Sequence, residues 1–398
     1  MIELSLFSGA GGGLLGSKLL GWKCVGYVEQ NEYCQRVLRA RIRDGFLDDA
    51  PIFPDVRTFN GRPYRGRVDI VTAGFPCQPF SVAGRRKGAG DERNMWPDTI
   101  RIIREVRPRC ALLENVPGLI SSGYFGTVLG DLAESGFDAE WCVLSAQDCG
   151  APHIRKRLWI VASNTNGNKL RKQSWRSQRE SGPERLSLEA MARRNAWPTP
   201  QARDWKGGNT PKPHGQHSPG LDVVVGGPLN PTWVEWLMGW PLNWSSLEPL
   251  PKENWDEWTE KHGSKTGSAI GQPNPVRAVW WDKDPSETPC RSESAKQCAD
   301  KYSGALSDMP QRGAQEGRNL GARHRSSSYV PNMRETVSTQ APTSEGSATV
   351  QQSKLFEGKR PAISRAAVGV VNRVERLRAL GNGQVPIVAA AAWGELTS

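Results

Sequence analysis

The sequence predicts an α/β protein whose main domain is a doubly wound, mostly parallel sheet. Short apolar segments of strand length alternate with segments of helical spacing through residues 1–162. A glycine-rich turn joins the first strand to the first helix, and polar residues directly follow several strands. Open parallel sheets bind ligands at the carboxyl ends of their strands, so we expect one shared crevice there.

The first strand and its turn have the pattern of a nucleotide-binding unit. Ile2–Phe7 is apolar and leads into a glycine-rich turn at residues 8–16. Glycines in the spacing G-x-G-x-x-G let the backbone approach a ligand closely and start a helix at once. This spacing is met by Gly11, Gly13 and Gly16. A second strand, Cys24–Val28, ends at Glu29, whose carboxylate is placed to accept hydrogen bonds from ribose hydroxyls.

The following elements continue this alternation. In chain order we expect a helix at Gln30–Arg43, a loop acid at Asp55, a strand at Val68–Val71, a helix at Asp98–Val106, a strand at Cys110–Leu113, a helix near Val128–Ser135, and strands at Cys142–Ala146 and Leu158–Ala162. The carboxyl edge of this sheet should bring together residues that are far apart in sequence: Gly9, Glu29, Cys77 and Glu114.

Cys77 lies between two prolines at the exit of a strand, in the sequence Gly-Phe-Pro-Cys-Gln-Pro-Phe-Ser at residues 74–81. Prolines fix the backbone and remove N–H donors, so the thiol is presented on a stiff turn. A basic, glycine-rich segment follows at residues 84–90 and suits a closing lid. A buried, inert cysteine is the alternative, because free cysteines are commonly buried. Beside a crevice, the pattern favours a nucleophile.

The composition favours a nucleic-acid partner. The 398 residues carry a formal net charge of +11, which suits a polyanion. The 8 cysteines include no C-x-x-C pair, and His214 and His217 have no cysteine or carboxylate cluster nearby, so we expect no metal site. The chain opens on a strand without an apolar leader, and no apolar run approaches about 18 residues, so we expect a soluble, cytoplasmic protein.

Two arginines precede the strand Leu158–Ala162. Arg155 and Arg157 alternate, so in an extended segment they would point to the same side. A run of basic residues usually lies on the solvent-exposed surface. Because this run directly precedes a buried strand, a role in the site and a position on the exposed surface are equally well supported.

Together these motifs resemble, in order, those of the cytosine-5 DNA methyltransferases, and the match is best to the type found in phages and prophages. The motifs are Phe7-Ser8-Gly9-x-Gly11-Gly12, Glu29, Asp55, Pro76-Cys77-Gln78, Glu114-Asn115-Val116, Arg155-x-Arg157 and Gly381-Asn382. The resemblance implies a Rossmann-like, S-adenosylmethionine-dependent methyltransferase fold with a smaller, irregular, loop-rich target-recognition domain. His153 departs from the glutamine usual in its place, which leaves the role of that position open.

The resemblance implies a reaction that needs a nucleophile, an acid and a cation. Cys77 would add to carbon 6 of cytosine, and Glu114 would serve ring nitrogen 3 as the charge moves there. Arg157 would hold the ring carbonyl oxygen, and Arg155 would support the loop and a phosphate. Because a duplex hides carbon 6 within the base stack, the base must flip out, and the basic segment after Cys77 would close over the DNA backbone.

The resemblance also implies the cofactor S-adenosylmethionine, held around the first glycine turn. Gly9 and its neighbours would approach its methionine end, Glu29 its ribose and Asp55 its adenine. The full set of expected cofactor residues is Phe7, Ser8, Gly9, Ala10, Gly11, Gly12, Glu29, Asp55, Pro76 and Asn382. The closing motif at Gly381-Asn382 would pack beside the first strand and complete this pocket.

The second half of the chain divides into three parts. Residues 163–284 form the expected target-recognition region, in which Trp233, Trp236, Leu237 and Trp240 have the helical spacing of a packed face. Residues 285–365 are rich in polar residues and lack periodicity, which predicts a poorly ordered insertion or, alternatively, a DNA-contacting arm. Residues 366–398 return to the catalytic domain of residues 1–162, which is therefore expected to be discontinuous.

Three other functions share some of these motifs. A dehydrogenase would use the same glycine spacing but gives no reason for the Cys77, Glu114 and Arg157 motifs. A transfer-RNA cytosine methyltransferase shares the cysteine motif, although its expected Cys-Phe-Thr sequence is missing. A catalytically inactive DNA-binding relative would lack the chemical residues, which are all present. We therefore expect a monomeric DNA (cytosine-5-)-methyltransferase that acts on double-stranded DNA.

Overall fold

The computed structural model describes residues 1–76, 94–165, 197–206, 220–262, 281, 286 and 363–397. All of them fall within one compact unit, which combines Met1–Thr288 with Ala362–Ser398. Cys77, the basic segment after it, much of the expected recognition region and almost all of the expected insertion lie outside the described residues. The division of the chain into three functional parts therefore stays a prediction.

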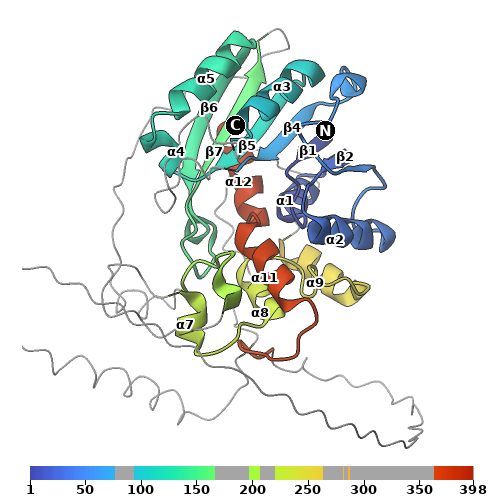
Figure 1. The fold of residues 1–398 in the computed structure, drawn as a ribbon, viewed down its shortest axis with the longest axis vertical. Helices are drawn as coiled ribbons and strands as arrows, with labels where there is room; N and C mark the ends of the chain where they lie inside the picture. The colour runs from blue at the N-terminus through green and yellow to red at the C-terminus, as the bar shows by residue number, and fades with distance from the viewer. Residues whose placement is uncertain are drawn as a thin grey trace, which may run out of the picture. The chain divides into compact units, whose positions relative to one another are not determined.

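The described core is a seven-stranded sheet in the order β3-β2-β1-β4-β5-β7-β6. The strands are β1 (Ile2–Leu6), β2 (Lys23–Val28), β3 (Ile52–Phe53), β4 (Ile70–Gly74), β5 (Cys110–Asn115), β6 (Phe137–Leu144) and β7 (Arg157–Asn164). The first five pair in parallel, whereas β7 runs antiparallel to both β5 and β6. The strand order reverses between β1 and β4, and the predicted doubly wound sheet is confirmed (Figure 1).

Helices cover both faces because the central strands are apolar on both sides. One hydrophobic cluster joins α1 (Gly12–Leu19), α2 (Glu32–Arg43) and α12 (Pro386–Thr397) to strand residues such as Ile70 and Leu112. The opposite cluster joins α3 (Trp96–Val106) and α5 (Phe125–Glu134) to their neighbours Val71 and Leu113. A short helix, α4 (Gly118–Ser121), precedes α5. Alternating side chains of the same strands thus build two separate cores.

The carboxyl-terminal helix completes the first of these layers. Figure 1 shows α12, in red, beside α1, and an added Cβ at Gly16 would lie 2.9 Å from the Ala389 methyl group. Glycine at this position therefore lets the two helices approach closely. The helix that follows the Gly381-Asn382 motif therefore packs against the first helix, and the role of the motif itself in a cofactor pocket stays a prediction.

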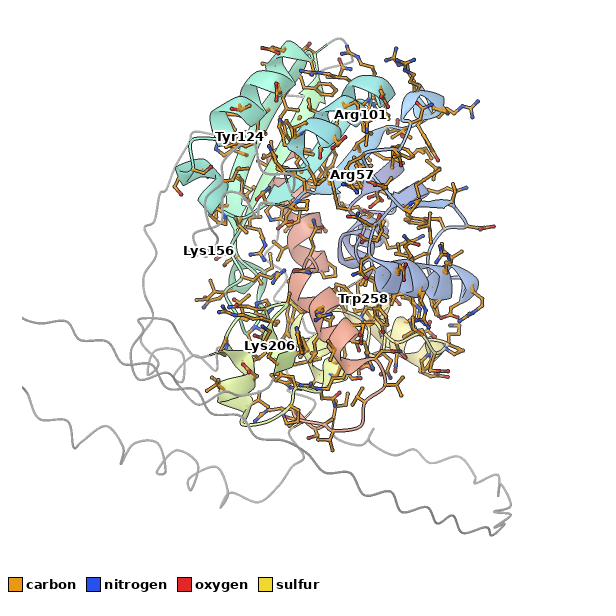
Figure 2. All side chains as sticks on the ribbon, in the orientation of Figure 1. Arg57, Arg101, Tyr124, Lys156, Lys206 and Trp258 are labelled. Atoms are coloured by element: carbon orange, nitrogen blue, oxygen red, sulfur yellow. The ribbon has the colours of Figure 1, made fainter. Side chains whose placement is uncertain are left out.

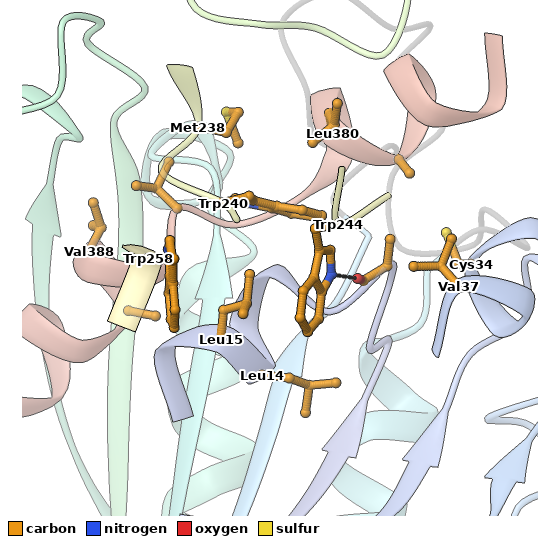
Figure 3. Packing of buried hydrophobic residues seen from close by; sticks show 14 of the residues in the cluster. Leu14, Leu15, Cys34, Val37, Met238, Trp240, Trp244, Trp258, Leu380 and Val388 are labelled. Carbon is orange, nitrogen blue, oxygen red and sulfur yellow. Dashed lines mark hydrogen bonds between the residues drawn. The ribbon is translucent and has the colours of Figure 1, made fainter. Parts of the chain in front are cut away.

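Tryptophans of the second half form a dense buried cluster below this layer. Trp233 and Trp236 lie on α8 (Pro231–Leu237), Trp240 and Trp244 follow it, and Trp258 lies on α9 (Lys252–His262). All five are buried, which confirms the predicted packed face. Figure 3 shows the Trp240 and Trp244 rings beside Leu14 and Leu15 of α1, so this region shares a core with the sheet domain.

An ion pair attaches the returning chain to the tryptophan region. Arg376 of α11 (Arg373–Asn382) lies 2.8 Å from Oε1 of Glu235 on α8. Both side chains are buried, and Glu235 also accepts hydrogen bonds from the backbone N–H groups of Asn243 and Ser245. Because buried charges need this degree of compensation, the network fixes α11 against α8.

Candidate active site

The carboxyl ends of four adjacent strands, β2, β1, β4 and β5, form the edge where the sequence places the site. Leu6 at the end of β1 is paired with Val28 on one side and Ala73 on the other, and Gly74 is paired with Glu114. The residues that follow these strands therefore emerge side by side. Gly9, Glu29, Pro76 and Glu114 all follow or end one of these strands.

The exit of β4 is fixed up to the residue before Cys77. The Phe75 ring is buried and packs 5.2 Å from the Trp96 ring, measured between centroids. The Asn115 side chain donates a 3.1 Å hydrogen bond to the Phe75 carbonyl and accepts one from the N–H of Val116. Pro76, the next residue of the chain, directly precedes Cys77 in the sequence.

Glu114 is held by donors on both carboxylate oxygens. The Arg157 Nε atom lies 2.8 Å from Oε1, and the Gln384 Nε2 atom lies 3.4 Å from Oε2. The Glu114 and Arg157 side chains are 14% and 21% exposed. This partial exposure keeps both groups within reach of a ligand while limiting water around them, which strengthens their interaction.

Arg155 has a different environment from Arg157. Its side chain is 5% exposed and donates to the carbonyl oxygens of Pro200, Gly381 and Gly383. Its φ of 29° lies in the left-handed region, and β7 begins only at Arg157. The regular extended segment that would place both arginines alike is therefore not formed, which corrects that expectation. Burial lowers the pKa of the Arg155 guanidinium, and the nearby Arg157 charge lowers it further.

His153 precedes β7 by four residues and contacts the end of helix α8. Its ring is fully buried, and Nε2 lies 3.0 Å from the carbonyl oxygen of Leu237 at the end of α8. Its backbone also forms an isolated bridge with Trp197. Burial lowers the pKa of His153 to about 3, with the Arg155 charge as a further cause, so the ring is neutral at physiological pH.

The glycine turn serves two different purposes. Gly9 has a φ of 57°, and no atom lies within 4 Å of the position that a Cβ would take. Gly11 and Gly12 are instead approached by the Trp244 and Trp240 side chains. Trp244 also donates a 2.7 Å hydrogen bond from Nε1 to the carbonyl oxygen of Ala10, drawn as a dashed line in Figure 3. The open position at Gly9 fits the close approach of a cofactor, whereas the later glycines admit protein side chains.

Glu29, the carboxylate predicted to bind ribose, directly follows β2 and contacts the glycine turn. Its Oε2 accepts a 2.7 Å hydrogen bond from Gly9 N–H, and its Oε1 accepts one from Asn31 N–H at 2.7 Å. Each carboxylate oxygen has a second lone pair for a ligand hydroxyl. Burial raises the pKa of Glu29, and the backbone donors oppose that rise. The donor set and the open Gly9 position fit a nucleoside-type cofactor.

The remaining expected cofactor residues lie in three places. Phe7 has a φ of 52° and turns the chain from β1 into the glycine segment, where the Ser8 hydroxyl donates to the carbonyl of Ser5. Asp55 forms a 2.8 Å ion pair with Arg57, labelled in Figure 2, and the hydrogen bonds from Arg57 lower the pKa of Asp55. Asn382 is exposed at the end of α11.

Three contacts around the site join residues too distant in sequence to be anticipated. Gln384 contacts Glu114 on β5, whereas Trp240 and Trp244 contact the glycine turn. For Gln384, the sequence offers a local indication of a functional role, because it is a polar residue in a short connection between a glycine and Val385-Pro386. Binding and catalytic residues are often found in such connections.

Within the described part of the chain, no group of three or more histidine, cysteine or acidic residues could hold a metal ion. In the same residues, no helix is long and apolar enough to cross a bilayer.

The sheet order, with its antiparallel β6–β7 hairpin at one edge, is a doubly wound arrangement whose ligand site is expected at the carboxyl ends of the parallel strands. Residues 1–205 match the family model of C-5 cytosine-specific DNA methylases, and the chain belongs to that family. This family uses S-adenosylmethionine as its cofactor.

Curated relatives are similar over the sheet domain. The type II methyltransferase M.NgoMIV of Neisseria gonorrhoeae is 34% identical over 163 residues, which cover 40% of this chain and 51% of the relative. M.AquIA of Picosynechococcus is 33% identical over 184 residues, covering 42% and 72%. The chain thus spans about half the length of the first relative.

Solved structures show a similar partial overlap. A putative DNA modification methyltransferase encoded within a prophage of E. coli is 26% identical, with a TM-score of 0.35, over 41% of this chain and 47% of that one. The Entamoeba histolytica methyltransferase EhMeth is 15% identical, with a TM-score of 0.44, over 65% and 92%.

Proposed function

We propose that this protein is a DNA (cytosine-5-)-methyltransferase that modifies a cytosine within a specific duplex sequence through a covalent Cys77 adduct. The observation that carries the proposal is the Arg157–Glu114 pair at the end of β5. It lies beside the β4 exit that leads through Pro76 to Cys77. A nucleophile, an acid and a cation at adjacent strand ends are the groups that this reaction needs.

The proposed reaction starts with addition of the Cys77 thiolate to carbon 6 of a flipped-out cytosine. The new carbon–sulfur bond uses the carbon 5–carbon 6 double bond, and negative charge moves towards ring nitrogen 3. Glu114 donates a proton or a hydrogen bond to that nitrogen. Carbon 5 then becomes nucleophilic, as in an enamine.

Arg157 has two tasks in this scheme. Its Nε orients Glu114, and its Nη1 donates to the carbonyl of Lys156, the residue labelled in Figure 2 just before β7. A guanidinium carries five N–H donors, so others can serve the carbonyl oxygen of the ring. Arg155, which is buried against three carbonyl groups, positions this loop rather than a phosphate.

The cofactor supplies an electrophilic methyl group when it is bound. Gly9 and Glu29 would hold its methionine and ribose ends, and Asp55 its adenine. After the transfer, a base removes the proton from carbon 5 and the carbon 6–sulfur bond breaks, which releases Cys77. The sheet domain and the buried tryptophans of residues 233–258 share one hydrophobic core. This shared core would hold the proposed target-recognition region in a fixed position beside the site.

Bisulfite sequencing of DNA from cells that express the protein tests this function. We expect protected cytosines in one recurring sequence, and none in cells that express Cys77→Ser. Protected cytosines in transfer RNA with unmodified DNA would support the alternative substrate. An absence of modified cytosine in both nucleic acids would contradict the proposal.

A further inference from the structure

Gln384 lies in the short connection between α11 and α12 and reaches the candidate acid. Its Nε2 atom is 3.4 Å from Oε2 of Glu114, which is 270 positions earlier in the chain. A carboxylate oxygen accepts hydrogen bonds, so an amide attracts it only through its nitrogen end. The observed orientation of the side chain is therefore the attractive one.

The Gln384 amide group lies so close to Gly13 and Gly74 that neither position has space for a side chain beside it. An added Cβ at Gly13 would lie 2.5 Å from the Gln384 Oε1 atom. An added Cβ at Gly74 would lie 2.8 Å from its Nε2 atom and 3.0 Å from Oε2 of Glu114. Glycines on α1 and at the end of β4 thus form the two walls around the Gln384 amide.

The backbone of Gln384 is held as firmly as its side chain. Trp240 donates a 2.8 Å hydrogen bond from Nε1 to the Gln384 carbonyl oxygen. Arg155 donates a 2.5 Å hydrogen bond to the carbonyl of Gly383, and the following Val385 and Pro386 are buried. A side chain whose backbone and walls are fixed in this way can set the position of the group that it contacts.

We propose that Gln384 is a positioning residue that, together with Arg157, orients the Glu114 carboxyl group towards ring nitrogen 3 of the cytosine. This inference rests on the proposed function. Arg157 holds Oε1 at 2.8 Å, a distance typical of a strong charge-assisted hydrogen bond. The contact from Gln384 to Oε2 is longer, at 3.4 Å, and hence weaker. Because a carboxyl oxygen can have more than one hydrogen-bond partner, Oε2 can face ring nitrogen 3 of the pyrimidine while it keeps the contact from Gln384.

The first test is the size-matched substitution Gln384→Met, which removes the amide donor. With Glu114 less well oriented, we expect kcat for DNA methylation to fall by about 10-fold, because misplaced catalytic groups lose rate steeply. KM for DNA and for S-adenosylmethionine should stay within about 2-fold, since Glu114 acts on the reacting ring. The control Gln147→Met makes the same change in the 3-10 turn Gln147–Cys149 and should keep the wild-type kcat.

The second test, Gln384→Glu, separates positioning from mere packing. An ionised carboxyl group beside Glu114 repels it, whereas a protonated one can donate a hydrogen bond in place of the amide. The ratio of the variant's kcat to the wild-type kcat should therefore rise as pH is lowered from about 8 to about 6. A residue that only fills space would give a constant ratio.

The outcomes distinguish this inference from the proposed function. A wild-type kcat in Gln384→Met, or a ratio of Gln384→Glu kcat to wild-type kcat that does not change with pH, overturns the role of Gln384. The proposed function stands in that case as long as the wild-type protein methylates DNA. A wild-type protein that methylates no DNA overturns the function itself. A fall in kcat with unchanged KM values, together with recovery of the second variant at low pH, supports the positioning role.

Discussion

The Nε atom of Arg157 lies 2.8 Å from Oε1 of Glu114, and this contact joins two strands that run in opposite directions. Arg157 is the first residue of β7, whereas Glu114 is near the end of β5. The antiparallel placement of β7 brings a cation to the carboxyl edge of a parallel sheet. A parallel strand in that position would begin at the opposite edge.

Replacing Arg157 with lysine should slow methyl transfer strongly. A lysine ammonium cannot reproduce the planar set of donors that contacts Glu114 and the Lys156 carbonyl. We expect a single-turnover rate about 100-fold below that of the wild type, as when one positioned donor is removed from an active site. The control is Arg109→Lys, which alters an exposed pair with Asp69. Equal rates for Arg157→Lys and the control would argue against a role of Arg157 in the reaction.

Arg155→Met should affect stability more than Arg157→Met does. Loss of the buried guanidinium leaves the carbonyl groups of Pro200, Gly381 and Gly383 without their donor. We expect the free energy of unfolding to fall by about 3 kcal/mol for Arg155→Met and by less than about 1 kcal/mol for Arg157→Met. Urea denaturation measures both. The opposite ranking would show that Arg155 does not hold the returning chain in place.

Gly74→Ala should impair methyl transfer with little loss of stability. The added methyl group would meet the side-chain ends of Gln384 and Glu114, both of which can shift without disturbing the backbone. We expect a rate about 10-fold below that of the wild type and a nearly unchanged melting temperature. The matched change Gly130→Ala, where no atom lies within 4 Å of the added Cβ, should keep the wild-type rate and slightly raise the melting temperature, because alanine is the better residue within helix α5. A fully active Gly74→Ala would show that this wall is not needed.

Glu3 should make the protein less stable as pH rises through neutrality. Burial raises the pKa of Glu3 to about 7 in the folded protein, above its ordinary value of 4.5, although the 2.6 Å hydrogen bond from Thr72 opposes that rise. The folded state therefore retains a proton that the unfolded chain releases above about pH 4.5. Stability is full below that pH and is lost as pH rises to about 7, by about 3 kcal/mol in total.

The substitution Glu3→Gln tests this dependence. Its neutral amide needs no proton, so the variant should be more stable than the wild type at pH 8 and similar to it near pH 5. Urea denaturation at both pH values gives the comparison, with Glu140→Gln on β6 as an exposed control. If the wild type and Glu3→Gln lose stability in parallel, the carboxyl group of Glu3 is ionised in the folded protein.

Local sequence patterns predicted the sheet because each strand carries its own signal. The apolar segments that form β4 and β5 can be recognised in the sequence without knowing which strands they pair with. The position of Glu114 directly after the second of these segments can be recognised in the same way. The boundaries shifted by a few residues, as in α3, which begins at Trp96 instead of Asp98. Burial on both faces accounts for that success.

The contacts that complete the site have no comparable signal. Trp244 touches Ala10 across 234 positions and Gln384 touches Glu114 across 270, and nothing in either neighbourhood encodes the other. The left-handed backbone at Arg155 was equally hidden, because residues other than glycine rarely adopt it. Such features depend on the tertiary packing of the returning chain.

The proposed reaction depends on a covalent bond between Cys77 and carbon 6 of the target cytosine. Once the target sequence is known, duplex DNA with 5-fluorocytosine at that position tests it directly. After methyl transfer, carbon 5 then carries fluorine in place of the hydrogen that a base would remove as a proton, so the carbon 6–sulfur bond cannot break and the adduct accumulates. We predict a denaturation-resistant complex that forms only with S-adenosylmethionine, with the DNA attached to the peptide that contains Cys77. Attachment to a different cysteine, or methylation of ordinary DNA without any trapped complex, would contradict the account.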